Sequence, residues 1–532
     1  MSSTNQQAVA QQRAGTPKGA GSLDEAKAGI PRNVLFNWGG LGANLVVGFL
    51  MAPFIVHRLG NTAYGIWELV LQLTGYMGVF DVGVRSALIR FVARFRAENN
   101  QSAMNQMLGV TLKFYAAFAL ACLVGAALLA GFVLPRMHIP ASMVRDSQIV
   151  LMLVAGTMAV GFTLGMFQTV LPALSRWDLL NTVNIGTLLL RTGLLVVFLL
   201  KGYGLVALAI IQFLTSVLGY GVCAILAHRL IPGMAPTWRS TGQNIVRPVF
   251  FHSLYAFLNS VGYRIIYNVD TIVIAAFLPI QNVALYVIGF KLIAYLRDMA
   301  NAATQIVAPL TSATEGSGHT SELSSLFLRG TKYVLLVAYP INVAFLVVGP
   351  DFIRLWMGRE YGATSGTVLI ILAAGQFVCF TQYVGGHMLY GLSKHGSLVR
   401  FTSSEAVLNL ALSLALVRQF GIYGVALGTT VAAIAVGVLF YPRAFFRNLS
   451  VRGSEFFRFC IVPVLLPTLA FTGGLLIVRL LISTDRVFGL AMAGAGGLAF
   501  YVPCVWFFGL DEGERDRIRD SRAWLWCKRR AA

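Results

Sequence analysis

The chain has 532 residues, of which 57% are hydrophobic and only 12% charged, and its formal net charge is +20. Because an ordinary soluble domain has about 25% charged residues, this composition excludes a soluble globular protein and indicates a membrane protein. The positive charges follow alternate loops between apolar segments and are not gathered in one basic domain, which argues against a nucleic-acid-binding protein.

Residues 1–31 are polar, show no apolar period and predict a disordered tail. The rest of the chain divides into about fourteen apolar segments of the length needed to cross a bilayer as helices. In chain order, the expected spans are 34–56, 62–84, 107–134, 148–172, 179–200, 203–227, 248–276, 282–310, 329–350, 363–390, 398–418, 422–446, 456–482 and 485–509.

The distribution of Lys and Arg over the loops predicts the orientation. Clusters of basic residues stand before the first span and after the second, sixth, twelfth and fourteenth spans, whereas the intervening loops hold single ones. By the positive-inside rule, both termini are expected in the cytoplasm. The basic tail 510–532 also contains tryptophans and is expected to lie on the membrane surface as an amphipathic segment.

The chain repeats itself at an offset of about 215 to 222 residues. The aligned pairs are Arg32 with Arg247, Asn37 with His252, Asn44 with Asn259, Ala63-Tyr64 with Leu285-Tyr286, Ser175-Arg176 with Ser393-Lys394, and Tyr203-Gly204 with Tyr423-Gly424. The repeat predicts an all-α membrane protein with two six-helix lobes, 32–230 and 231–446, related by a pseudo-twofold axis. Helices in 447–509 lie outside the repeat, and a substrate site is expected between the halves.

Ionisable residues interrupt the apolar spans, above all between Arg247 and Leu310. Because a charge at the bilayer centre costs about 2.5 to 3.5 kcal/mol, these side chains should face a polar interior. In the second span, Glu68, Gln72 and Tyr76 recur every four residues and predict one polar face. Glu68 also falls within one residue of the repeat position of Lys291, which suggests that the two charges pair across a central cavity.

Three segments carry a resemblance to a known family: residues 57–67 (HRLGNTAYGIW), 80–84 (FDVGV) and 87–93 (ALIRFVA). They resemble the polysaccharide-synthesis exporters of the O-antigen flippase type, in the multidrug/oligosaccharidyl-lipid/polysaccharide superfamily. The resemblance implies a MATE-like fold and a multi-pass protein of the bacterial inner membrane. It also implies movement of undecaprenyl-diphosphate-linked sugars to the outer leaflet during O-antigen, lipopolysaccharide or exopolysaccharide biosynthesis.

Such a substrate needs cations for the diphosphate and polar side chains for the glycan. The candidate substrate-binding residues are Arg264, Lys291, Arg297, Arg191, Asn37, Asn44, His252, Tyr255, Asn259, Tyr263 and Tyr267. The candidates for ion coupling or gating are Glu68, Asp270, Gln72 and Asp298. The expected partners are the lipid-linked oligosaccharide, membrane lipids, H⁺ or Na⁺, and polymerase or assembly proteins, but no nucleic acid.

Several alternatives stay open. Arg264 with Asp270, or Lys291 with Asp298, could form structural ion pairs that never meet a substrate. A cation-coupled multidrug exporter and a lipid II flippase are rival transporters, and a non-transporting scaffold of a glycan assembly complex is a third rival. The sequence has no phosphate-binding loop and no Cys/His cluster, so no enzyme activity, cofactor or metal is predicted.

Overall fold

The computed structural model describes residues 20–78, 82–237, 243–316 and 320–520, and every element in them is helical. Within α2 and α9, side chains are described from Gly39 and Leu258 onward. The α-helices are α2 (Ala20–Met77), α3 (Val82–Ala97), α4 (Gln101–Leu128), α5 (Ala141–Thr163), α6 (Val170–Ala173), α7 (Trp177–Leu200), α8 (Leu205–Leu230), α9 (Gln243–Phe277), α10 (Gln281–Thr304), α11 (Val307–Gly316), α12 (Thr320–Met357), α13 (Arg359–Phe380), α14 (Tyr383–Gly391), α15 (His395–Tyr441), α16 (Arg447–Leu449), α17 (Gly453–Phe456), α18 (Val462–Leu481) and α19 (Val487–Cys504). Short π or 3₁₀ turns extend several of them, including η2 (Leu129–Val133) and η4 (Gly165–Thr169).

Two of the long helices bend at a glycine in the left-handed region, where a residue with a Cβ would be strained. Gly60 in α2 has φ 77°, and Gly421 in α15 has φ 59°. Each of these helices therefore contains two of the expected spans. The predicted end of the second span was wrong, because α2 ends at Met77 and α3 is a separate helix. At its other end α2 begins at Ala20, inside the segment 1–31 for which the sequence predicts no structure.

The described residues contain ten helical segments long and apolar enough to cross a membrane, so the chain is a multi-pass membrane protein. The helices α9 and α10 are not among the ten. Three charged residues, Lys291, Arg297 and Asp298, lie close together in α10, and they make this helix too polar to be recognised by hydropathy alone.

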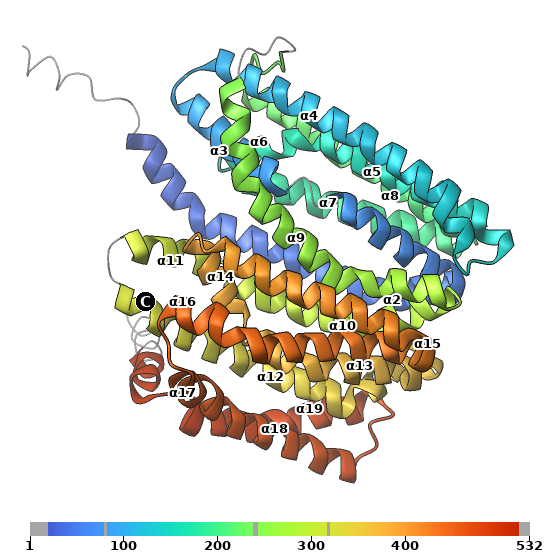
Figure 1. Ribbon diagram of the computed structural model, residues 1–532, viewed down its shortest axis with the longest axis vertical. Helices are drawn as coiled ribbons and strands as arrows, with labels where there is room; N and C mark the ends of the chain where they lie inside the picture. The colour runs from blue at the N-terminus through green and yellow to red at the C-terminus, as the bar shows by residue number, and fades with distance from the viewer. Residues whose placement is uncertain (1–19, 79–81, 238–242, 317–319, 521–532) are drawn as a thin grey trace, which may run out of the picture.

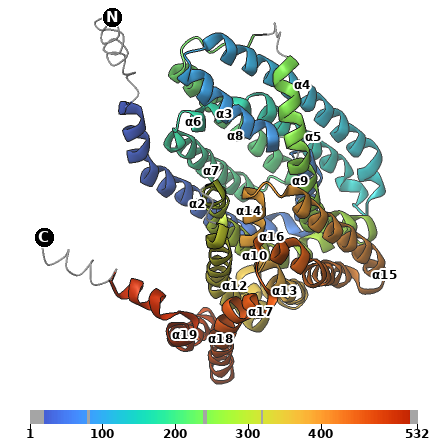
Figure 2. The same ribbon diagram turned by 60° about the vertical axis from the view of Figure 1, so that its left-hand side comes forward.

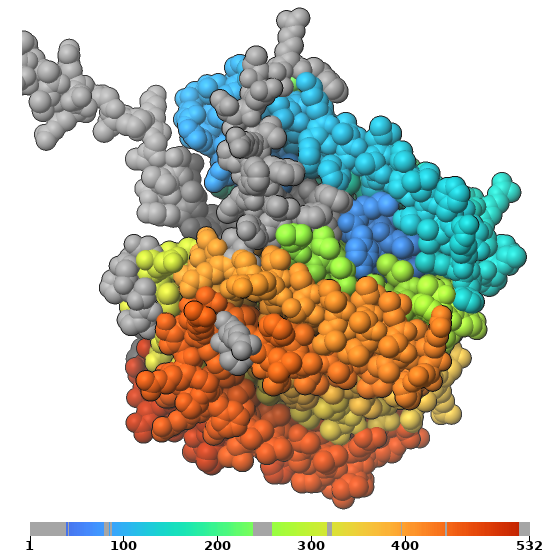
Figure 3. All heavy atoms as spheres, in the orientation of Figure 1, coloured from blue at the N-terminus to red at the C-terminus, as the bar shows by residue number. Residues whose placement is uncertain are grey.

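The helices form two bundles with α2 and α9 between them (Figure 1). In one bundle α4 packs on α5, and α8 packs on both α5 and α7. In the other, α13 packs on α10, α12 and α15, while α18 and α19 pack on each other and on α12 at the outer side (Figure 2). The space-filling view shows the same division, with N-terminal residues on one side and C-terminal residues on the other (Figure 3).

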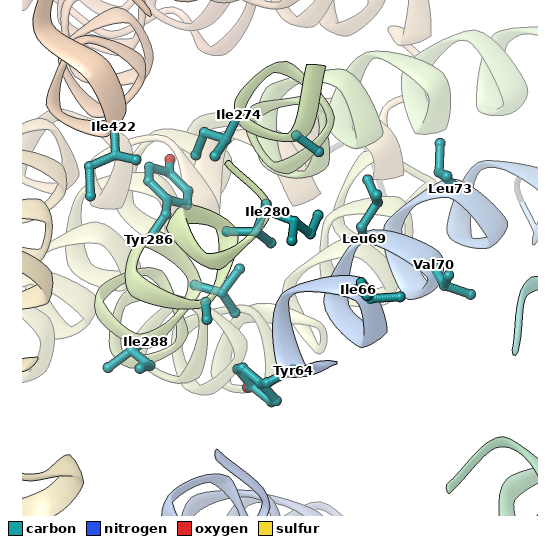
Figure 4. Close-up of a cluster of buried hydrophobic side chains, with 14 of the residues drawn as sticks. Tyr64, Ile66, Leu69, Val70, Leu73, Ile274, Ile280, Tyr286, Ile288 and Ile422 are labelled. Atoms are coloured by element: carbon teal, nitrogen blue, oxygen red, sulfur yellow. The ribbon is translucent and has the colours of Figure 1, made fainter. Parts of the chain in front are cut away.

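A shared apolar core joins the two bundles. It combines Leu69 and Val70 of α2 with Ile274 of α9 and Tyr286 of α10 (Figure 4). Close packing of these side chains helps to hold the halves together where α2 crosses α9 and α10, since lipid is as apolar as the side chains themselves.

At one end of the molecule the bundles are sealed by polar and aromatic contacts. Trp356 of α12 stacks on Phe49 of α2 with a centroid distance of 4.8 Å, and its Nε1 donates to the Phe49 carbonyl at 3.0 Å. The Tyr361 hydroxyl donates to Asn61 Oδ1 at 2.6 Å. The Ile280 N–H donates to the carbonyl of His138 at 3.2 Å, so loops from both bundles meet here.

Backbone geometry repeats at one pair of positions that the sequence repeat aligns. Ser175 and Ser393 both have positive φ, 57° and 54°. The next residues, Arg176 and Lys394, both donate to the carbonyl five residues earlier, at 2.9 Å each. Equivalent helix-ending turns therefore precede α7 and α15.

Candidate functional site

Glu68 and Lys291, which the sequence repeat places within one residue of equivalent positions, are in contact across the halves. Lys291 on α10 donates to Glu68 Oε1 on α2 at 2.7 Å and to the Tyr64 hydroxyl at 2.5 Å. The Glu68 side chain is 6% exposed and that of Lys291 is 26% exposed. One ion pair, largely shielded from solvent, thus links the N-terminal and C-terminal halves.

A second contact between the halves lies where α2 crosses α9, and Arg264 of α9 is located there. Gly75 of α2 has no side chain and leaves space for Arg264. Its Nη1 is 2.8 Å from the point that a Cβ on Gly75 would occupy. The Tyr76 hydroxyl donates to the Arg264 carbonyl at 3.1 Å and fixes the crossing. Among the described residues no carboxylate pairs with this guanidinium, so its charge is available to an anionic ligand.

Arg297 is held by aromatic rings. Its Cζ lies 3.6 Å from the ring centroid of Tyr267 and 5.1 Å from that of Phe290. Tyr267 stacks on Tyr263, whose side chain is 41% exposed. A cation beside stacked tyrosines can bind a charged group while the rings contact the apolar face of a sugar.

The hydrogen-bond partners of Asp270 are neutral, in contrast to the ion pair with Arg264 that the sequence left open. It is 1% exposed, and its Oδ2 accepts from Tyr286 at 2.5 Å and from Thr429 at 2.7 Å. Its Oδ1 is buried without a hydrogen-bond partner. Asn409 on α15 donates to Thr429 Oγ1 at 3.3 Å and completes an oxygen-rich cluster.

Sequence reasoning missed Tyr286, Asn409 and Thr429 as partners of Asp270. A signal was present, because Asn409 and Ser413 stand four residues apart on one face of an apolar span. The other structural pair, Lys291 with Asp298, is also absent: Lys291 contacts Glu68, and Asp298 is exposed.

The remaining candidates are dispersed. Gln72 is half-buried on α2 between Glu68 and Tyr76, and Asn44 is exposed and donates to the Gly40 carbonyl of its own helix at 2.9 Å. Asn259 accepts from Thr402 at 3.1 Å, which ties α9 to α15. Arg191 lies on α7 in a different, smaller cavity. The side chains of Asn37, His252 and Tyr255 lie outside the described residues.

An apolar cavity opens beside Arg264 between α2, η2 and α9. Its volume is about 470 Å³, and it is lined by Leu73, Tyr76, Met77, Leu129, Ile265, Val269 and Ile272. The Arg264 cation and the apolar cavity therefore lie along one seam between the bundles, where α2 crosses α9. Such a seam can accommodate an amphiphile with an anionic head and a hydrocarbon chain.

A family model matches residues 30–315, more than half of the chain, and its description is "polysaccharide biosynthesis protein". The chain belongs to this family. The matched region contains α2 and α10, and hence the Glu68–Lys291 pair as well as Arg264 and Asp270.

Curated relatives are similar over different lengths. A probable low-salt glycan biosynthesis flippase, Agl15 of Haloferax volcanii, is 26% identical over 44% of this chain. The match spans 48% of that relative, about half of its length. A putative O-antigen transporter of Shigella flexneri is 20% identical over 77% of this chain and 96% of the relative.

Solved transporter structures, one of them described as a MATE transporter of the MOP superfamily, are similar in fold to this chain. The lipid II flippase MurJ in an inward closed conformation has a TM-score of 0.69 at 13% identity, covering 90% of this chain and 98% of that chain. A multidrug resistance MATE transporter in an inward-facing conformation has a TM-score of 0.57 at 15% identity, covering 77% of this chain and 94% of that chain. At these identities the likeness concerns the fold alone.

Proposed function

We propose that this protein is a flippase that moves a polyprenyl-diphosphate-linked oligosaccharide from the cytoplasmic to the outer leaflet of the bacterial inner membrane. The observation that carries the proposal is the position of Arg264 at the seam between the bundles, next to an apolar cavity. The relatives described as a flippase and an O-antigen transporter support the same substrate class.

The proposed topology has about fourteen spans and cytoplasmic termini. It counts α2 and α15 twice, because each bends at a glycine, and it adds α9 and α10 to the ten apolar segments. The matching turns at Ser175 and Ser393 support two lobes related by a pseudo-twofold axis. With this topology, the end sealed by Asn61 and Tyr361 faces outward, and the structure represents a state closed on that side.

In the proposed mechanism, each group of residues contacts a different part of the substrate or controls its release. Arg264 binds the diphosphate, since a guanidinium donates hydrogen bonds to phosphate oxygens in pairs. Arg297 and the stacked rings of Tyr263 and Tyr267 hold the first sugars. The lipid chain stays beside the apolar cavity. The Glu68–Lys291 pair breaks when the lobes separate on the outer side, so that the glycan is released there.

Coupling to a cation gradient is assigned to Asp270. A carboxylate with one unpartnered oxygen, surrounded by amide and hydroxyl groups, can bind H⁺ or Na⁺, since hard cations prefer oxygen ligands. The cluster lies between α9, α10 and α15, so ion binding there can change how α9 and α10 pack against α2. A change in the ion occupancy of Asp270 is thereby transmitted to the seam.

Deletion and complementation test the proposed function. The deletion strain is expected to lose a surface polysaccharide and to accumulate its lipid-linked precursor, and the wild-type gene should reverse both effects. Unaltered glycans together with sensitivity to cationic drugs would instead identify a multidrug exporter. Accumulation of the peptidoglycan precursor would identify a lipid II flippase. If membranes that lack the protein translocate the precursor normally, the protein is not the flippase, and the scaffold alternative would be favoured.

A further inference from the structure

A second cavity, which is polar, lies in the N-terminal bundle. Its volume is about 110 Å³, and α7, α8 and η4 enclose it. Among its lining residues are Gln168, Asn184, Thr187, Arg191 and Thr215. The described residues that line it include no aspartate or glutamate, although Arg191 contributes a full positive charge. A cation that faces only neutral polar groups is complementary to an anion.

The polar lining on α7 is confined to one face of the helix. Asn184, Thr187 and Arg191 follow one another at intervals of three and four residues, which places them on one side. Leu189 and Leu190 are 57% and 43% exposed and lie on another side. The apolar side of α7 therefore suits contact with lipid, and its polar side lines a chamber inside the bundle.

The helix α8 has the same division. Ser216, Gly219 and Tyr220 line the cavity, whereas Leu214 and Leu218 are 58% and 49% exposed. Two helices thus turn polar faces toward each other, and the space between these faces suits water or a polar ligand.

Glycines bring the walls of the chamber close together. A Cβ on Gly219 would come within 3.0 Å of Thr187 Cγ2, so this glycine allows α8 to approach α7. The Tyr220 hydroxyl lies 3.0 Å from the position of a Cβ on Gly161, so its ring packs where a side chain is missing. The cavity is consequently a defined feature of how α5, α7 and α8 pack.

The hydrogen bonds leave both donors and acceptors facing the cavity. Gln212 Oε1 accepts one N–H of Arg191 at 3.0 Å and orients the guanidinium, which has five N–H donors. Thr187 and Thr215 donate to carbonyls of their own helices at 2.9 Å and 2.7 Å, so their oxygens act as acceptors toward the cavity. Acceptors suit sugar hydroxyls, and the guanidinium suits a carboxylate.

We propose that the Arg191 cavity binds an acidic sugar, a polyol ring that carries a carboxylate, and that the transported glycan contains such a unit. The inference rests on the proposed function only for the statement that this sugar belongs to the transported glycan. With 110 Å³, the cavity is well below the roughly 300 Å³ of a typical drug-sized pocket and fits one sugar unit at most.

The test uses the purified full-length protein in nanodiscs and four probes at fixed ionic strength: methyl glucuronide, methyl glucoside, inorganic phosphate and inorganic diphosphate. Binding is followed by saturation-transfer NMR and by the thermal unfolding temperature. The variants are Arg191→Gln, Arg191→Lys and Thr187→Val, and the matched control is Lys201→Gln, which removes an exposed positive charge at the end of the same helix.

Methyl glucuronide is expected to bind, and Arg191→Gln should weaken its binding by at least about ten-fold. Arg191→Lys should give an intermediate affinity, Thr187→Val a smaller loss, and Lys201→Gln none. Equal binding of glucoside and glucuronide, or unchanged glucuronide binding by Arg191→Gln, would overturn the proposal. Phosphate or diphosphate binding that depends on Arg191, without glucuronide binding, would also overturn it and assign the cavity to a bare anion. None of these results depends on translocation, so failure of the flippase proposal would be recognised separately by transport assays.

Discussion

Glu68→Gln removes the carboxylate that holds Lys291 across the two halves while it keeps the size of the side chain. The wild-type pair has a separation of 2.7 Å, and the Lys291 ammonium also contacts the Tyr64 hydroxyl. In the variant, an amide oxygen replaces the charged acceptor. We expect the sealed end to open more often, because this pair exists only while α2 and α10 are in contact.

The magnitude follows from the burial of the pair. Removing one partner of a fully buried ion pair costs about 3 to 5 kcal/mol. The Lys291 side chain is 26% exposed, so solvent compensates part of this loss, and we expect about 2 kcal/mol. At about 1.4 kcal/mol per factor of ten, the ratio of open to sealed molecules should rise about 30-fold.

Distance measurements between nitroxide labels at Arg58 and Arg359 provide the assay. Both residues are exposed and flank the contact between Asn61 and Tyr361. Double electron–electron resonance should show a second, longer distance in Glu68→Gln and one short distance in the wild type. As a control, Glu98→Gln removes the carboxylate of an exposed pair with Arg94 and should change nothing. If Glu68→Gln keeps both the short distance and normal transport, the proposal that the Glu68–Lys291 pair stabilises the sealed state is wrong.

Three further variants probe the seam, the coupling site and the C-terminal helices. Gly75→Ala places a Cβ 2.8 Å from the Arg264 guanidinium, so it should shift this cation and weaken diphosphate binding several-fold in a binding assay. Asp270→Asn preserves the size of a side chain that is 1% exposed but removes its charge, and transport should lose its dependence on the ion gradient. Glu514→Ala leaves Lys332, which pairs with it at 2.5 Å, buried without its partner and should lower stability by about 3 kcal/mol in thermal unfolding.

Each of these variants has a matched control. Gly78→Ala meets no atom within 4 Å and should bind diphosphate like the wild type. Glu512→Ala removes an exposed carboxylate two residues before Glu514 and should not change the unfolding temperature. Asn409→Ala keeps the Asp270 charge, so it should retain gradient dependence with altered ion affinity. Equal behaviour of a variant and its control would contradict the corresponding assignment.

The sequence predicts the parts of this structure that depend on composition and on the repeat. Apolar length indicates most of the helices, and the repeat placed Glu68 within one residue of the position equivalent to Lys291, with which it is in contact. It also aligned Ser175 with Ser393, which share a left-handed backbone conformation. Apolar length is a local property, and the repeat is present in both halves of the sequence. Both can therefore be recognised in one sequence without an alignment.

Other features could not be read from the sequence because they depend on packing between distant helices. Residues 78–80 contain no charge, so the first charged residue, Asp81, comes four positions after α2 ends at Met77. The partners of Asp270 come from α10 and α15, which are 16 and 159 residues away in the chain. The Arg297 guanidinium lies on the Tyr267 ring of α9, a contact between two helices that composition does not predict.

Translocation by the purified protein tests the central claim most directly. Proteoliposomes that contain a polyprenyl-diphosphate-linked oligosaccharide are treated with a glycan-cleaving enzyme that cannot enter, and the protected fraction is followed under an imposed ion gradient. The wild type should expose the protected glycan, Arg264→Gln should not, and Arg90→Gln, which changes an exposed arginine, should behave like the wild type. Equal exposure with the wild type, with Arg264→Gln and without protein would contradict the account.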